Sequence, residues 1–231
     1  MCVGSSRHLL ALSLLPLTVL LFPCFGWAHE LSQPVPILLE RMHDALLLIN
    51  RGKLDHAYTK AVSIQEDFPD SSRGRLIQEV GLRRTAQRLD GVYKTSLAEE
   101  TAQALEQKDM PRLQKALYSL SFLLILEKLD RLAQLMADPQ ARPDTKAAVL
   151  AVAHDYFSHM FERLLRFRAA EQIQALDLLL DRMAVAVKRG DAPSLEALRR
   201  QFVGGLFQGF QEQLVSGQLR PTLASTREVG P

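Results

Sequence analysis

Four residues near the middle of the chain have the types and the spacing of metal ligands: His154, Asp155, His159 and Glu162. Asp155, His159 and Glu162 are separated by four and then three residues, which places them on one stripe of an α-helix. One imidazole and two carboxylates on such a stripe could give two or three ligands to zinc or iron. The same spacing is typical of a solvated polar face, in which Asp155 pairs with His159 and Glu162 with Arg166. We favour the polar face and keep the metal site as the alternative.

A second candidate metal site is the pair Glu40 and His43, which has the Glu-x-x-His spacing of carboxylate-bridged di-iron proteins. Such sites need that motif on two helices together with two further glutamates. The Glu-x-x-His motif occurs once in this chain, at Glu40 and His43. His159 and Glu162 have the same spacing in the reverse order, His-x-x-Glu. One copy of so short a pattern is weak support for a di-iron site.

A third possibility for metal is the amino terminus that leader cleavage would create at His29. A free amine beside an imidazole can chelate copper, but a good site needs a second histidine supplied by the fold. His43 and His56 are near in sequence and are the candidates for that role.

Signatures of enzymatic catalysis are absent from the sequence. The chain has no Gly-x-Ser-x-Gly nucleophile elbow, no glycine-rich phosphate loop or dinucleotide fingerprint, and no Cys-x-x-Cys-His haem attachment. We therefore predict a protein that is not an enzyme and that holds no cofactor, apart from the metal alternative above.

The first residues resemble a secretory signal peptide, which we assign to Met1–Ala28. Arg7 gives a short positive start, Leu9–Phe22 an apolar core, and Gly26 with Ala28 a small-x-small cleavage site. The mature protein is then predicted to be periplasmic or secreted. The alternative is an uncleaved anchor, because the apolar stretch is nearly long enough to span a bilayer.

Removal of this leader would also remove both cysteines, Cys2 and Cys24, and the single tryptophan, Trp27. The mature chain would have no disulfide, no thiolate metal site and no cysteine nucleophile. Its stability must come from a hydrophobic core, which about 200 residues can supply.

Composition restricts the class of partner. The chain has 231 residues, 47% of them hydrophobic and 23% charged, with a formal net charge of +2. These values are typical of a folded globular protein. A charge so close to zero, with both signs interspersed, argues against nucleic acid, because phosphate binding requires a basic stripe. We expect a protein partner, and no membrane span in the mature chain.

The element around which the fold is predicted to form is Leu113–Met136. Its apolar residues recur at helical spacing, and Phe122, Leu123, Ile125 and Leu126 make its middle apolar almost all the way round. A helix without a polar face cannot lie on a surface. It is also too short in its uninterrupted apolar run to cross a membrane. We predict a buried central helix that the other helices cover.

The remaining helices are predicted from capping residues and breakers. Asp109 and Asp191 are expected to cap the central and the last helix, each with a proline in the first turn. Apolar positions in three-four alternation, Phe167 among them, predict one long helix over Thr145–Arg189. The other predicted elements are a helix from Ser32 to Arg51, a helix from Lys53 to Phe68, a turn at Pro69–Ser72, a helical region over Arg73–Lys108 with a break near Gly91 and a Ser96-x-x-Glu99 capping box, and a last helix that contains Gly204, Gly205 and Gly209.

These elements predict an all-α fold, an antiparallel bundle of about six helices built as stacked hairpins. Its domain would cover 29–215, after the signal peptide at 1–28 and before a disordered tail at 216–231. Sheet content should be close to nil. The glycines of the last helix weaken it by themselves, so we expect them to permit close approach of a neighbouring helix.

Gly52–Pro69 resembles the second half of a tetratricopeptide unit, with a glycine, an alanine five residues later and a proline at the end. Such arrays bind other proteins, but they need three or more units, and this chain shows one. The hairpin around Asp109 is loosely similar to the extracytoplasmic domains of bacterial iron permeases, although the Arg-Glu-x-x-Glu motif of that family is absent. We predict an exported binding or scaffolding protein with a protein partner, and as the alternative a periplasmic accessory protein that binds a divalent metal.

Overall fold

The computed structural model describes residues 37–70, 77–215 and 217–219. This part of the chain is helical apart from one pair of three-residue strands, which confirms the all-α class. The predicted leader, the copper ligand His29 and the predicted helix start at Ser32 lie outside the described residues.

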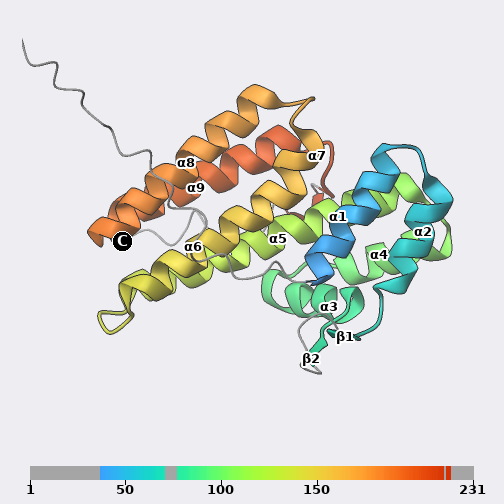
Figure 1. Cartoon of the computed structure of the whole chain (residues 1–231), viewed down its shortest axis with the longest axis horizontal. Helices are drawn as coiled ribbons and strands as arrows, with labels where there is room; N and C mark the ends of the chain where they lie inside the picture. The colour runs from blue at the N-terminus through green and yellow to red at the C-terminus, as the bar shows by residue number, and fades with distance from the viewer. Residues whose placement is uncertain (1–36, 71–76, 216, 220–231) are drawn as a thin grey trace, which may run out of the picture.

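The elements follow one another with short connections, and Figure 1 labels most of them. In chain order they are α1 (Ile37–Asn50), α2 (Leu54–Ser63), β1 (Phe68–Asp70), β2 (Ile77–Glu79), α3 (Leu82–Tyr93), α4 (Leu97–Glu106), α5 (Met110–Ala137), α6 (Pro143–Phe157), a π-helical turn η1 (Ser158–Glu162), α7 (Arg163–Leu165), α8 (Ala170–Arg189) and α9 (Ala192–Phe210).

Helix α5 is the buried central element that the sequence predicts. Near its first residues it packs against α1 and α4, and further along it packs against α3, α6 and α9 (Figure 1). Its middle is buried on every side, including the hydroxyls of Ser119 and Ser121, which donate to the backbone of the preceding helical turn. Because α5 has no polar stripe in this region, coverage by helices from both sides keeps it out of water.

Three helix hairpins close with the same type of turn. Gly52, Lys108 and Gly190 each follow a helix in the left-handed conformation, with φ of 71°, 53° and 69°. In the second and third hairpins the carboxylates of Asp109 and Asp191 then accept from the backbone of the new helix at 3.0 Å. Both predicted aspartate caps are confirmed, and the cause is the same in each: the side chain satisfies an orphan N–H of the first turn.

The prediction of one long helix over Thr145–Arg189 is wrong. The helix widens into the π turn η1, ends after α7, and the chain turns back through Arg166–Ala169 into α8. Backbone bonds from Arg168 and Ala169 to the Leu165 carbonyl, at 2.8 and 3.0 Å, close α7. No glycine or proline marks this turn, so local propensity gives no sign of it. The turn allows α6 and α8 to pack against each other.

The predicted boundaries in the first half need correction. Helix α2 ends at Ser63, not at Phe68, and α3 begins at Leu82, after the antiparallel strand pair in which Phe68 is opposite Glu79. The break between α3 and α4 is confirmed, but its cap is different. Ser96 makes no side-chain capping bond; instead the carboxylate of Asp90 accepts from the backbone N–H groups of Leu97 and Ala98, both at 2.8 Å.

Gly81, which precedes α3, lies directly against the backbone of Glu66. A Cβ at this position would lie 2.3 Å from the Glu66 carbonyl carbon, so only glycine fits. The Gly81 N–H donates to Asp67 Oδ1 at 2.7 Å, and this bond, together with Arg84, holds the pKa of Asp67 below its usual value. This contact fixes the connection between α2 and α3.

The glycines of α9 allow close approach at two of three positions. A Cβ at Gly209 would overlap the side chain of Gln172, and one at Gly205 would lie 3.2 Å from Leu176 Cδ2, whereas Gly204 faces open space. Helix α9 therefore packs closely on α8. Beyond the predicted domain end, residues 217–219 form a further helical turn, and Leu219 is 0% exposed. The rest of the predicted tail lies outside the described residues.

No helix among residues 37–70, 77–215 and 217–219 combines the length and the apolar character needed to cross a membrane.

Candidate functional site

His154, the first of the four candidate ligands, faces α8. Its Nε2 lies 3.7 Å from Oδ1 of Asp177, a residue outside the predicted cluster. Burial, reinforced by the nearby Glu162 and Asp181, raises the pKa of Asp177, while His154 opposes the rise. Within the described chain Asp177 Oδ1 has no hydrogen-bond partner, and the carboxylate is stabilised by the imidazole mainly through charge when that ring is protonated.

His159 lies in the π turn, and both of its ring nitrogens have partners. Nδ1 lies 2.9 Å from the backbone carbonyl of Asp155, and Nε2 lies 3.2 Å from Nη1 of Arg163. A carbonyl can only accept and a guanidinium can only donate, so this geometry fits a neutral ring with its proton on Nδ1. The lone pair on Nε2, which a metal would need, is directed at a cation.

Glu162 has separate partners of its own. One carboxylate oxygen accepts from Ser158 Oγ at 2.8 Å, and the other lies 3.8 Å from Arg166. The Glu162–Arg166 pair is the one that the polar-face interpretation predicts. The other predicted pair does not form as expected, because His159 bonds the carbonyl of Asp155 and not its carboxylate.

The π turn explains why the predicted stripe is not retained. A π-helical turn holds more residues than an α-helical one, so the angular spacing of three and four residues no longer superposes the side chains on either side of it. Asp155 precedes this turn, whereas His159 and Glu162 lie within it. His159 and Glu162 consequently find separate partners of their own.

The second candidate site lies close to the first in space. His43 on α1 and His159 in the π turn have ring centroids 6.3 Å apart in an edge-to-face arrangement, although they are distant in sequence. Partial burial lowers the pKa of His43; Asp44 opposes this, and His159 and Arg163 reinforce it. Glu40, the other half of the Glu-x-x-His pair, is exposed.

Among the described residues no group of three or more histidine, cysteine, aspartate or glutamate side chains is placed to hold a metal ion. The two imidazoles that do meet, His43 and His159, share their surroundings with the guanidinium of Arg163. The contacts shown are a ring contact between α1 and the π turn and hydrogen bonds from His159 to α6 and α7.

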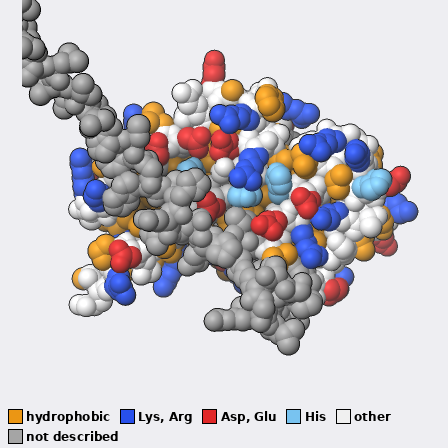
Figure 2. Space-filling model, in the orientation of Figure 1, with side chains coloured by type: hydrophobic (Ala, Val, Ile, Leu, Met, Phe, Trp, Pro, Cys, Tyr) orange, Lys and Arg blue, Asp and Glu red, His pale blue; other side chains and the backbone are white. Residues whose placement is uncertain are grey.

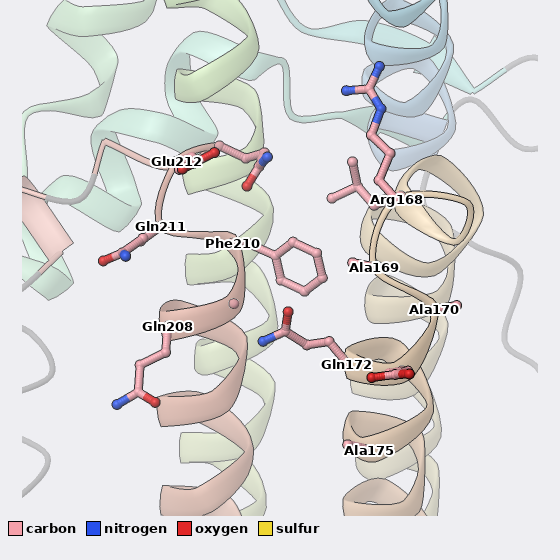
Figure 3. Close-up of a pocket in the computed structure, with 13 residues that line it drawn as sticks. Arg168, Ala169, Ala170, Gln172, Ala175, Gln208, Phe210, Gln211 and Glu212 are labelled. Carbon is pink, nitrogen blue, oxygen red and sulfur yellow. The ribbon is translucent and has the colours of Figure 1, made fainter.

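A groove of about 980 Å³ lies between the start of α8 and the end of α9 (Figure 3). Gln172 points across it toward α9, and the Phe210 ring forms part of its floor (Figure 3). Arg168, Glu171 and Glu212 add charges of both signs to its walls. The groove is mainly polar, and the absence of a side chain at Gly209 makes room for Gln172 beside α9.

Phe167, next to this groove in the turn before α8, is 100% exposed. The sequence places it among the core positions of a continuous helix, and that prediction is wrong because the chain turns before the residue can be buried. Its neighbours Arg166 and Arg168 are exposed as well. Across the face shown in Figure 2, basic and acidic side chains are interspersed, in keeping with the small net charge.

No protein-family model, no curated protein and no solved structure matches this chain.

Proposed function

We propose that this chain is an exported scaffolding protein that binds another protein through the turn between α7 and α8. The observation that carries the proposal is the full exposure of Phe167 in that turn. Burying a phenylalanine side chain contributes roughly 1.5–3 kcal/mol. Phe167 is not buried in the described fold, so this free energy does not stabilise the fold. Binding to a partner with an apolar pocket would bury the side chain and gain it.

The residues around Phe167 suit such a contact. Arg166 and Arg168 flank it on the exposed turn, and phenylalanine and arginine are both enriched at protein interfaces. The partner surface would then be an apolar pocket with carboxylates on its rim. Arg166 already lies 3.8 Å from Glu162, so Arg168 would be the principal charged contact.

The turn is supported by rigid elements, which favours binding. Backbone bonds to the Leu165 carbonyl close it on one side, and α8 begins at Ala170 on the other. Leu165 itself is buried in the core, so it anchors the turn. A side chain presented in this way loses little conformational freedom on association.

The proposal includes the location and the architecture. Cleavage of Met1–Ala28 would deliver the mature chain to the periplasm or the medium, where its partner would be found. The helices would serve as an antiparallel bundle around α5 that holds the binding turn in place. His154, His159 and Glu162 already have the ion-pair and hydrogen-bond partners described above, which supports the binding proposal over the metal-binding alternative.

The test begins with a photo-crosslinking amino acid at position 167 in the tagged protein, expressed in its native host. A partner identified in this way is then purified, and its affinity is measured by titration calorimetry. Phe167→Ser should weaken binding by at least about tenfold, the equivalent of 1.4 kcal/mol. Val92→Ser, at another exposed apolar side chain, is the matched control and should leave the affinity unchanged. Equal affinities of the two variants would refute the proposed binding surface.

A further inference from the structure

The outer face of α8 carries a stripe of exposed residues at heptad spacing. Leu178 and Val185, seven residues apart, are 49% and 48% exposed, although both are large and apolar. Ala175 and Arg182 continue the alternation of three and four residues between and beside them, and both are exposed. This spacing is the one by which two helices pack along a common seam. Figure 1 shows α8 at the upper edge of the molecule, with no other described helix above it.

The stripe is complementary to itself when reversed. If two copies of α8 pack antiparallel about a two-fold axis at the midpoint of Asp181 and Arg182, Leu178 of one copy lies opposite Val185 of the other. The same axis places Asp181 of each copy opposite Arg182 of the other, so the interface contains two such ion pairs. A two-fold interface requires this kind of reciprocity, in which residue i meets j and j meets i.

The charges at the ends of the stripe agree with the same register. Glu171 lies in the first turn of α8 and Arg189 in its last turn, and both are exposed. Antiparallel packing brings the acidic start of one helix to the basic end of the other. Parallel packing would instead place like charges side by side at both ends and at the centre, so charge selects the antiparallel arrangement.

We propose that a second copy of this chain docks on α8 in this antiparallel register. Within the described residues neither Asp181 nor Arg182 forms an ion pair with its own chain, so both are available to the other copy. The surface is separate from Phe167, so dimerisation and partner binding are independent, and the dimer would present two binding turns.

The expected dimer is weak. A helix of 20 residues is about 30 Å long, and a single pair of such helices forms an interface at the small end of the range for specific complexes. We expect a dissociation constant on the order of micromolar to hundreds of micromolar.

Sedimentation equilibrium between about 5 µM and 1 mM would measure the association. Asp181→Arg brings two guanidinium groups together, because the new side chain faces Arg182 of the other copy, and it should weaken the dimer at least about tenfold. Arg182→Asp should do the same with the opposite sign of charge. The double variant Asp181→Arg with Arg182→Asp exchanges the two charges, recreates the pair and should restore most of the affinity.

Two controls make the result decisive. Circular dichroism should show all three variants folded, because both side chains are exposed, and Val62→Ala should leave association unchanged, because this exposed valine lies on α2. A monomer at every concentration would overturn the proposal. So would a dimer that the single charge reversals do not weaken, or one that the double exchange does not recover.

Discussion

Arg199 of α9 and Asp130 of α5 form a largely buried ion pair, with 2.5 Å between Nη1 and Oδ1. Tyr93 of α3 donates to the other oxygen of Asp130 at 2.9 Å, and Glu196 accepts from Nε and Nη2 of Arg199 at 2.8 and 3.0 Å. Burial raises the pKa of Asp130, and the hydrogen bond from Tyr93 and the charge of Arg199 oppose that rise. One polar network therefore joins α3, α5 and α9.

Arg199→Met should destabilise the protein by about 2–3 kcal/mol, because it leaves Asp130 buried without its cation. The expected loss of stability is smaller than the loss on breaking a fully buried ion pair, because the Asp130 side chain remains 33% exposed to solvent. Arg200→Met is the control. Arg200 is exposed, and its ion pair with Glu196, at 3.6 Å, is a weak surface pair, so the free energy of unfolding should change by less than about 1 kcal/mol. Urea denaturation measures both, and equal midpoints for the two variants would contradict the role given to Arg199.

Gly81→Ala should destabilise the chain strongly, because its Cβ would collide with the backbone of Glu66. Accommodating the methyl group requires the α2–α3 connection to move and the bond to Asp67 to break, which together should cost about 2 kcal/mol or more. Gly91→Ala makes the same chemical change in the last turn of α3, where a Cβ meets nothing within 4 Å. That control should stabilise the protein by about 0.5–1 kcal/mol. In thermal unfolding, the melting temperature should fall for Gly81→Ala and rise for Gly91→Ala.

Asp177→Asn should raise the melting temperature at pH 7. The folded-state pKa of Asp177 lies above its usual value near 3.8, because burial disfavours the charged form. A carboxyl group of this kind stabilises the folded chain while it is protonated, and that stability is lost as the pH rises through the folded pKa. The advantage of the asparagine should therefore be present at neutral pH, shrink as the pH falls through the raised folded-state pKa, and be gone below the usual value.

Thermal melts at pH 7, 5 and 3.5 would follow this difference, with Glu106→Gln, an exposed carboxylate on α4, as the control. A lower melting temperature for Asp177→Asn at pH 7 would mean that the contact with His154 outweighs the burial of the carboxylate.

Leu120→Ala tests the central position of α5. Leu120 is 0% exposed, and truncation of a buried leucine costs about 2–5 kcal/mol through lost burial and the cavity that remains. Val92→Ala, at a side chain that is 58% exposed, should change the free energy of unfolding by less than about 0.5 kcal/mol. If the two variants unfolded at similar denaturant concentrations, α5 would not be the core of the fold.

Zinc, ferrous iron and copper should bind no more tightly than about millimolar at pH 7. The reason is the geometry of His159, whose Nε2 lies 3.2 Å from a guanidinium, while His154 is directed toward Asp177. Titration calorimetry on the purified protein would test this. Micromolar affinity that disappears in His159→Ala would instead support the metal-binding alternative.

Features governed by local sequence could be predicted well. The caps at Asp109 and Asp191 follow from one side chain and the turn next to it, and the burial of α5 follows from the lack of any polar face. In both cases the cause lies within a few residues of the effect, so the pattern contains the information.

Features that depend on distant contacts could not be predicted. The turn at Arg166–Ala169 contains no breaker residue, and it brings α6 into contact with α8, whose residues lie far along the chain. That turn is also what exposes Phe167. Similarly, the proximity of His43 to His159 and of Asp177 to His154 results from tertiary packing, and the π turn alters the helical spacing on which the predicted stripe depends.

The central position of α5 has a consequence for how the protein unfolds. Helices α1, α3 and α4 from the first half of the described chain and α6 and α9 from the second half all pack against it, so neither group can detach without exposing apolar surface of α5 to water. Amide protons at the centre of α5 should therefore exchange with solvent only through complete opening of the protein, with the same protection free energy on both sides of the midpoint. Local opening should be confined to the exposed turns, and unfolding should occur as a single cooperative event.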